Sequence, residues 1–305
     1  MHCTDVIVDV LAMWAPQPAP VRHLVRVAEL CGFTENAARV AVRRLVVAGK
    51  LEAQTTDDRA GYRLSRDAAA FNQHVRRAVS RPRTRPWSGA WLQVLMSLPD
   101  RQRKRRAAMQ RALSVLRLRS PYRGVWMRPD NLDVNQHDVV MQLGEAGGDG
   151  ERPHVLAARF FDPARERALA ADLFELETTA EEQRRALTVV ERARDELLTL
   201  PLGDAVAASI GLGRAAIGVL FRDPLLPAAL LPTDWAADAL RHGFAATSAL
   251  AAELWRRWAE AEGDRSGIDT ARLRQIFDEV TVRASLPELW EAPALAYEMP
   301  SRAAP

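Results

Sequence analysis

The chain has 305 residues and 48% of them are hydrophobic, which excludes a disordered chain and predicts roughly two or three domains with their own cores. The net charge is only +3, but residues 1–128 hold 24 Lys/Arg against 9 Asp/Glu, whereas residues 129–305 hold 18 against 30. This asymmetry favours a polyanionic partner for the front of the chain. A general bias towards arginine, which supplies 40 of the 42 basic residues, is the alternative, but it does not explain why acidic residues are scarce in the same half.

The sequence shows no export signal, membrane span or metal motif. The N-terminus has no basic start followed by an apolar run, so we expect no signal peptide. Residues 205–221 are apolar but are interrupted by Arg214 and hold three glycines, which favours a buried helix over a membrane span. Cys3 and Cys31 offer neither a disulfide framework nor metal-ligand spacing. We therefore expect a cytoplasmic protein with no metal, no cofactor and no membrane partner.

Two amphipathic helices are predicted at the start of the chain, separated by the proline-rich residues 16–20. The apolar residues at helical spacing are Val6, Val10, Met13 and Trp14 in residues 5–15, and Val21, Leu24, Val25, Ala28 and Cys31 in residues 21–31. Gly32 suits the left-handed backbone position that ends a helix.

A third helix is predicted after Thr34, which can cap it, and Glu35 lies at its positive end. One face of this helix holds small or apolar residues that can pack closely on a neighbour: Ala38, Ala41, Val42 and Leu45. The opposite face carries Asn36, Arg39, Val40, Arg43 and Val47, with Arg44 at its edge. Asn and Arg are the residue types that bind adenine and guanine edges in the major groove of DNA. The pattern therefore predicts a recognition helix.

A hairpin is predicted directly after this helix, which ends at Gly49: residues 50–54 and 62–65 form its strands, with Arg59 near the tip. The order of helices, turn, recognition helix and hairpin is typical of a winged helix-turn-helix. The predicted DNA-binding residues are Asn36, Arg39 and Arg43 in the major groove, Arg44 and Lys50 at phosphates, and Arg59 and Arg63 on the wing. The alternative is a winged helix that contacts only protein. Residues 66–82 favour a linking helix, and the Pro/Arg-rich residues 81–86 are the clearest domain boundary.

The middle of the chain predicts a ferredoxin-like α/β unit. Strands are expected at residues 90–97, 124–128, 138–143 and 154–161, and a basic helix at residues 101–118, with its inward residues at Ala108, Ala112, Val115 and Leu116. The basic run at residues 101–106 has three interpretations: a solvated surface, a contact with the DNA backbone, or a site for the phosphates of a CoA-type ligand.

The C-terminal half is acidic and predicts long helices. Residues 178–200 favour one helix capped near Thr179, and residues 233–263 favour another. The second helix carries buried-face candidates at Ala237, Leu240, Phe244, Leu250, Leu254 and Trp258. Such apolar faces pack either against a second copy of the chain in a dimer or inward against the core of the same chain. The predicted fold class is α+β, mainly α, with a winged helix-turn-helix at 1–80, a ferredoxin-like domain at 87–177 and a helical domain at 178–305.

Several stretches of this sequence resemble the PaaX family of bacterial transcriptional regulators. "GFTENAARVAVRRLVVAGKLE" with "GYRLS" matches its winged helix, and "WSGAW", "RRAAMQRAL" and "RGVWMRP" match its middle domain. "RDPLLPAALLPTDW" matches its C-terminal segment. The resemblance covers roughly residues 5–260. Departures from the family pattern at residues 160–163, at 215–221 and after Trp235 lie outside the predicted DNA-binding module.

The resemblance implies a homodimeric repressor that binds double-stranded operator DNA and responds to an acyl-CoA effector such as phenylacetyl-CoA. The candidate ligand-binding residues are Trp87, Trp91, Arg105, Trp126 and Arg128. Large aromatic residues also fill protein cores, which is the alternative for the three tryptophans.

An enzyme, either a nuclease or a CoA-thioester enzyme built on the middle domain, is the alternative from another class. A metal-dependent nuclease needs several carboxylates around Mg²⁺. Asp100 stands after the first middle strand but is followed by five basic residues within residues 101–106, which favours a helix cap over a metal ligand. We therefore expect no enzymatic activity.

Overall fold

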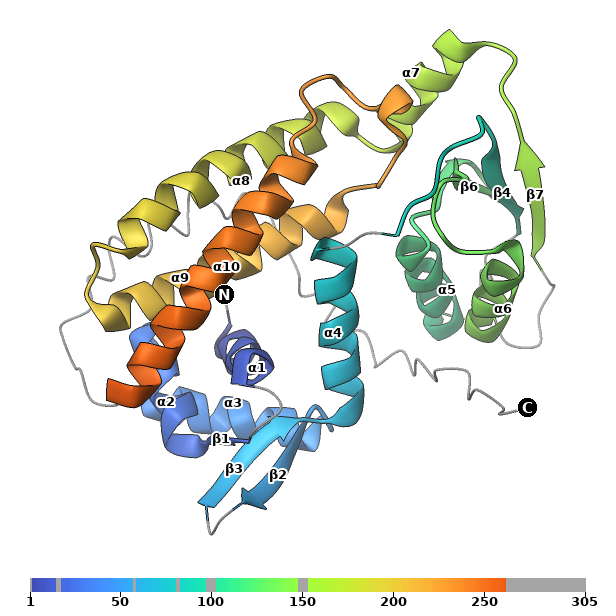
Figure 1. Cartoon of the computed structure of the whole chain (residues 1–305). Helices are drawn as coiled ribbons and strands as arrows, with labels where there is room; N and C mark the ends of the chain where they lie inside the picture. The colour runs from blue at the N-terminus through green and yellow to red at the C-terminus, as the bar shows by residue number, and fades with distance from the viewer. Residues whose placement is uncertain are drawn as a thin grey trace, which may run out of the picture. The chain divides into compact units, whose positions relative to one another are not determined.

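The structure is a computed structural model of the whole chain, and it describes residues 2–14, 18–56, 59–80, 83–96, 103–147 and 153–261. The chain forms two compact units, one made of residues 1–80, 182–221 and 236–305 and the other of residues 81–181 and 222–235. The described residues are mainly helical, with two small antiparallel sheets (Figure 1). The predicted α+β, mainly α, fold class is confirmed.

The front of the first unit has the order of elements predicted for a winged helix-turn-helix. These elements are α1 (Cys3–Trp14), β1 (Ala19–Pro20), α2 (Val21–Leu30), α3 (Glu35–Val47), β2 (Leu51–Thr56), β3 (Arg59–Leu64) and α4 (Arg66–Ser80). The hairpin β2–β3 and the short β1 form an antiparallel sheet of order β1-β3-β2. The sheet begins directly after α3, because the Lys50 amide donates to the Leu45 carbonyl and the chain then enters β2.

Local signals set the ends of α2 and α3 as the sequence predicts. Gly32 follows α2 with φ +82°, and Gly49 follows α3 with φ +67°, a region that side chains rarely adopt. The Thr34 hydroxyl oxygen accepts a hydrogen bond from the Ala37 amide at 3.2 Å, so Thr34 caps α3.

The rest of the first unit is helical, and includes α8 (Leu176–Leu197) from Glu182 onwards, α9 (Leu202–Arg222) up to Phe221, and α10 (Ala237–Ala261). The predicted cap near Thr179 is wrong. Helix α8 begins three residues earlier, after Glu175 at φ +49°, and the Thr179 amide bonds to the Glu175 carbonyl inside the first turn.

Helix α9 is the described helix that is long and apolar enough to cross a membrane, and 72% of its apolar window is buried inside the protein. A core helix meets the same criteria of length and composition, so α9 is the buried helix that the sequence predicts.

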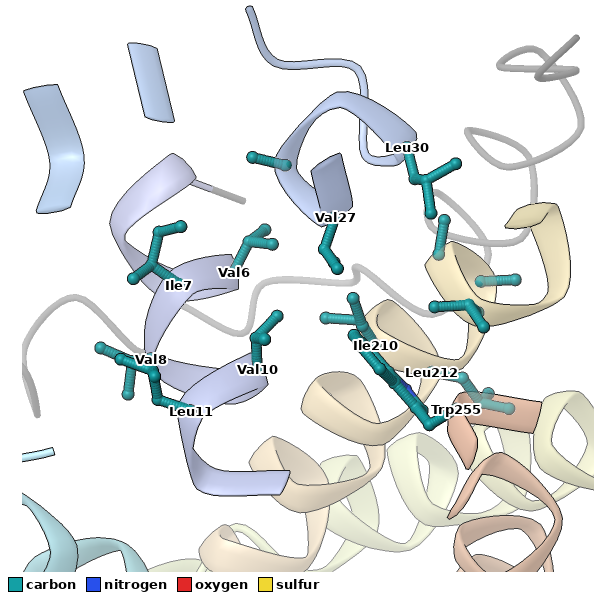
Figure 2. Close-up of a cluster of buried hydrophobic side chains, with 14 of the residues drawn as sticks. Val6, Ile7, Val8, Val10, Leu11, Val27, Leu30, Ile210, Leu212 and Trp255 are labelled. Atoms are coloured by element: carbon teal, nitrogen blue, oxygen red, sulfur yellow. The ribbon is translucent and has the colours of Figure 1, made fainter. Parts of the chain in front are cut away.

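One hydrophobic core joins the N-terminal helices to α8, α9 and α10. Figure 2 shows Val10 of α1 and Val27 of α2 pointing towards Ile210 of α9, with Trp255 of α10 in the same cluster. The His23 ring of α2 meets the Trp258 ring of α10 edge-to-face, with centroids 6.3 Å apart. The buried faces of α9 and α10 therefore fold inward against the N-terminal helices.

A buried ion triad also joins α1 to α9. Arg214 binds Asp5 at 3.3 Å and Asp9 at 3.0 Å, and its side chain is only 15% exposed. Burial raises the pKa of Asp9 to about 6, although the Arg214 guanidinium lowers it in part.

The second unit holds a four-stranded antiparallel sheet with helices. Its elements are β4 (Trp91–Leu95), α5 (Arg103–Val115), β5 (Arg119–Tyr122), β6 (Val125–Pro129), α6 (Gln136–Gly147), β7 (His154–Ala158), α7 (Pro163–Leu173) and the short 3-10 helix η1 (Ala228–Leu230). The strand order β5-β6-β4-β7 and the β-α-β-β-α-β succession are those of a ferredoxin-like fold, as predicted.

Two predictions for this unit are wrong. Residues 138–143 lie in helix α6 and not in a strand: Asn135 Oδ1 accepts from the Asp138 amide at 2.8 Å, and Val139 and Leu143, one turn apart, are both fully buried. Val115, expected to face inward, is 42% exposed at the end of α5, whereas Ala112 and Leu116 are buried as predicted.

The two faces of this sheet carry separate apolar clusters. On one face Leu92, Val94 and Trp126 pack with residues of α5 and α6. On the other, Trp91 and Met127 pack with α7 and with Leu226 and Leu230 of the segment 222–235.

Candidate functional site

The outer face of α3 presents the polar residues that the sequence assigns to DNA. Asn36, Arg39, Arg43 and Arg44 are all exposed, while the opposite face, Ala38, Ala41, Val42 and Leu45, is at most 6% exposed. Val46 and Val47, at the end of the helix, are also exposed, at 38% and 84%. The face is therefore polar for most of its length and apolar at its C-terminal end.

Two of the predicted DNA-binding arginines have acidic neighbours. Arg39 pairs with Glu35 at 2.7 Å, one turn back on α3, and Arg63 on β3 pairs with Glu52 on β2 at 2.9 Å. All four side chains are about half exposed, and such surface pairs contribute only about 0–1 kcal/mol. A polyanion can replace these pairs at little cost.

The side chains of Arg43 and Arg44 make no hydrogen bond or ion pair with any residue that the structure describes. Lys50 is partly buried at the junction of α3 and β2. Arg59 opens β3 next to the hairpin tip; its side chain and residues 57–58 lie outside the described part of the chain.

The candidate ligand-binding tryptophans, which the structure describes, lie on both faces of the sheet. Trp91 is fully buried, donates its indole N–H to Glu166 Oε1 at 2.6 Å, and meets the Phe160 ring at 5.4 Å. Trp87 packs on the same face of the sheet and donates to the Ala90 carbonyl at 2.7 Å. Trp126 packs on the opposite face. The side chain of Arg105 lies outside the described residues.

Arg128 is buried in the second unit, with 2% of the residue exposed. Its Nη1 donates to the Pro129 carbonyl at 2.9 Å, while Nε and Nη2 are buried without a hydrogen-bond partner. Burial lowers the pKa of Arg128 to about 10, a shift that Asp130 opposes and that Arg85 and Arg117 increase.

Hydrogen bonds within the second unit connect two stretches that are far apart in the sequence. Arg117 Nη1 donates to the Asp223 carbonyl, and Asn131 Nδ2 donates to the Leu225 carbonyl at 2.8 Å. Asp223 is 2% exposed, and its carboxylate accepts from the Leu225 amide at 2.9 Å, which holds Leu225 at φ +56°. The "RDPLLPAALLPTDW" stretch is thus hydrogen-bonded to residues that precede and follow the "RGVWMRP" stretch.

The sequence singles out Arg128, but it does not indicate the nearby charges of Arg85 and Arg117 or the buried contacts of Asn131 and Asp223. Asn131 and Asp223 stand in or beside the quoted stretches, and only the folded chain shows that Asn131 binds Leu225 and that Arg117 binds Asp223.

The described residues hold no cluster of three or more His, Cys, Asp or Glu that could bind a metal ion. Asp100, the candidate metal ligand in the sequence, lies outside the described residues. Cys3 and Cys31 are both free, and burial raises the pKa of the Cys31 thiol to about 12.

Comparison with known proteins gives consistent matches along the chain. Residues 4–68 match the model "PaaX-like protein", residues 84–170 match "PaaX protein central Cas2-like domain", and residues 172–261 match "PaaX-like protein C-terminal domain". No curated protein matches the chain.

Among solved structures, the chain is similar to "Uncharacterized protein Rv0674 from Mycobacterium tuberculosis", with 31% sequence identity and a TM-score of 0.60. The match covers 83% of this chain and 97% of that one. These three family matches, together with this structural match, show that the chain belongs to the PaaX family, a family known for transcriptional regulation.

Proposed function

We propose that this protein is a DNA-binding transcriptional regulator that inserts α3 into the major groove. The observation that carries the proposal is the division of α3 into a buried small-residue face and an exposed face of Asn36, Arg39, Arg43 and Arg44. The close packing of α3 on α1 and α2 leaves this polar face directed outward. Arginine binds guanine edges and asparagine binds adenine edges through paired hydrogen bonds.

In this proposal Asn36, Arg39 and Arg43 contact bases, and Arg44 and Lys50 contact phosphates. Arg59 and Arg63 on the hairpin β2–β3 add backbone or minor-groove contacts. The excess of basic residues in residues 1–128 supports the same assignment, because phosphate neutralisation supplies much of the affinity for DNA.

The protein acts in the cytoplasm as a homodimeric repressor of a catabolic operon, with an acyl-CoA such as phenylacetyl-CoA as its effector. Dimerisation fits a helix-turn-helix protein because two recognition helices bind two half-sites one turn of DNA apart. Only family membership supports an acyl-CoA effector. The DNA-binding test below is therefore made with and without phenylacetyl-CoA.

Fluorescence anisotropy of the full chain on DNA from upstream of its own gene, against random DNA of equal length, tests the proposal. We expect tighter binding to the upstream DNA, a steep loss of affinity as salt rises, and release by phenylacetyl-CoA. Specific binding that is unaffected by the thioester would keep the regulator and remove the effector. Equal, weak and salt-independent binding to both DNAs, repeated with genomic fragments, would overturn DNA recognition and favour a winged helix that contacts protein.

A further inference from the structure

Two valines stand in the middle of the polar face of α3. Asn36, Val40, Arg43 and Val47 follow one another at spacings of four, three and four residues, which places them on one face of the helix. Val47 is 84% exposed and Val40 is partly exposed, and neither packs against a hydrophobic core that the structure describes. By contrast, Val42 on the opposite face is 4% exposed and belongs to the core. Packing within the described part of the chain therefore does not account for Val40 and Val47.

Helix stability does not account for the two valines either. Valine has a lower intrinsic helix propensity than alanine, because its branched side chain is restricted against the preceding turn. Alanine occupies several other positions of α3, among them Ala37, Ala38 and Ala41. Val40 and Val47 thus keep a branched apolar side chain at positions where a smaller one favours the helix.

The basic neighbours of the two valines restrict what can cover them. The side chains of Arg43 and Arg44 are exposed on the same stretch of α3. An apolar protein surface placed there would take these guanidinium groups out of water without supplying acceptors, which is costly. The major groove of DNA presents both kinds of partner side by side, namely the acceptor atoms of guanine and the 5-methyl group of thymine. The alternation of arginine and valine therefore favours DNA over an apolar partner.

We infer that Val40 and Val47 contact the methyl groups of thymines, so that the operator half-site carries thymine beside the base that Arg43 contacts. The Cα–Cβ bonds of an α-helix tilt towards its N-terminus, so Val47 covers the turn that carries Arg43. The inference rests on the proposed insertion of α3 into the major groove. It adds to that proposal a base-specific contact that needs no hydrogen bond.

Replacing thymine by deoxyuridine tests the inference, because this change removes only the methyl group and keeps every hydrogen-bonding atom of the base. The preferred sequence of the full chain is first selected from a randomised duplex library. Each thymine of that sequence is then replaced singly, and the base pair at which Arg43→Ala loses its preference locates the contact of Arg43. Anisotropy titrations compare wild type, Val40→Ala and Val47→Ala on every duplex.

We expect one replacement beside the base contacted by Arg43 to weaken wild-type binding about three- to fivefold, because a buried methyl-sized group is returned to water. The same replacement should have no further effect on Val47→Ala, since the two groups lose one shared contact. A second replacement should be coupled to Val40→Ala in the same way.

Leu198→Ala is the matched control, because Leu198 is an apolar side chain in the same unit, directly after α8, and is 66% exposed. It should distinguish thymine from uracil like the wild type. Circular dichroism melting verifies that each variant folds.

Two outcomes overturn the inference and leave DNA recognition intact: sequence-selective binding that no uracil replacement weakens, or a uracil effect that persists unchanged in both Val40→Ala and Val47→Ala. A lower dimer fraction of Val47→Ala in analytical ultracentrifugation, with the uracil effect retained, would assign the valines to an interface between copies of the chain. Selection of no sequence, together with weak and salt-independent binding, overturns the proposed function and this inference with it.

Discussion

Arg43 and Arg44 are neighbours on α3, but their expected contacts differ. Both side chains are exposed and make no hydrogen bond or ion pair with a described residue, so in the proposed DNA complex neither has to give up a partner. In the proposed complex, Arg39 and Arg63 would each exchange a glutamate partner for DNA, at a small cost because both ion pairs are solvated.

Arg43→Ala is expected to cost about 1–3 kcal/mol of operator affinity and to relax the preference at one base pair, because a bidentate contact to a base edge is lost. Arg44→Ala should weaken operator and random DNA alike and lower the salt slope by about 1, as expected for a phosphate contact. Anisotropy titrations on both DNAs measure these effects. Arg194→Ala, an exposed position on α8, is the control. Equal losses of Arg43→Ala on operator and random DNA would contradict its assigned role.

The raised pKa of Asp9 predicts a dependence of stability on pH. Between its usual value of about 3.9 and about 6, the folded state binds more protons than the unfolded state. The contribution of Asp9 to the free energy of unfolding is therefore highest at low pH. It falls as the pH rises to about 6, by at most about 1.4 kcal/mol per pH unit. Asp9→Asn should remove this component of the slope.

Denaturant unfolding of wild type and Asp9→Asn between these pH values measures the difference. Asp238→Asn serves as the control, because the Asp238 side chain is 88% exposed. A difference between wild type and Asp9→Asn that does not change with pH would contradict the shift.

At the scale of the element, the sequence predicts most of the winged-helix part because its signals are local. Thr34, Gly32 and Gly49 each set a helix end by their own hydrogen bonding or backbone conformation. The sequence predicts a strand at residues 138–143, because a short apolar run has no clear helical or strand period. Their capping residue, Asn135, decides the helix together with burial on α5.

Other features of the helices and strands cannot be predicted from neighbouring residues in the sequence. The meeting of Asn131 with Leu225 joins residues 94 positions apart, and the division of Trp91 and Trp126 between two faces depends on strand register. The order β5-β6-β4-β7 also follows from long-range pairing.

Thr34→Ala is expected to lower the free energy of unfolding by about 1 kcal/mol, because the first turn of α3 loses the acceptor for the Ala37 amide. Operator affinity should fall as well, because Asn36 and Arg39 lie in that turn and its successor. Thr188→Ala, whose hydroxyl bonds within α8, should change stability by less than about 0.5 kcal/mol. Chemical denaturation compares the two variants, and equal stability of Thr34→Ala and wild type would show that the cap contributes nothing.

At the scale of the whole molecule, each compact unit is made of segments that are not contiguous in the sequence. The N-terminal helices share one core with α9 and α10, which come more than a hundred residues later. The three family matches nevertheless divide the chain in sequence order, as does the predicted organisation into 1–80, 87–177 and 178–305.

Residues 1–80 made alone are therefore expected not to fold cooperatively. Val10, Val27 and their neighbours would lose Ile210 and Trp255, and would present an apolar surface to water. Heat or urea should give a broad transition, and an apolar dye such as ANS should bind. The full chain is the comparison. A sharp, reversible transition of the fragment, with little dye binding, would show that the N-terminal helices are stable without α9 and α10.

The shared core also has a consequence for synthesis on the ribosome. Residues 1–80 leave the ribosome before α9 is made, and at about 5–20 residues per second the wait lasts on the order of ten seconds. During that interval the apolar sides of α1 and α2 have no partner from their own chain. We therefore expect the nascent N-terminus to be a client for a chaperone until translation has passed α10.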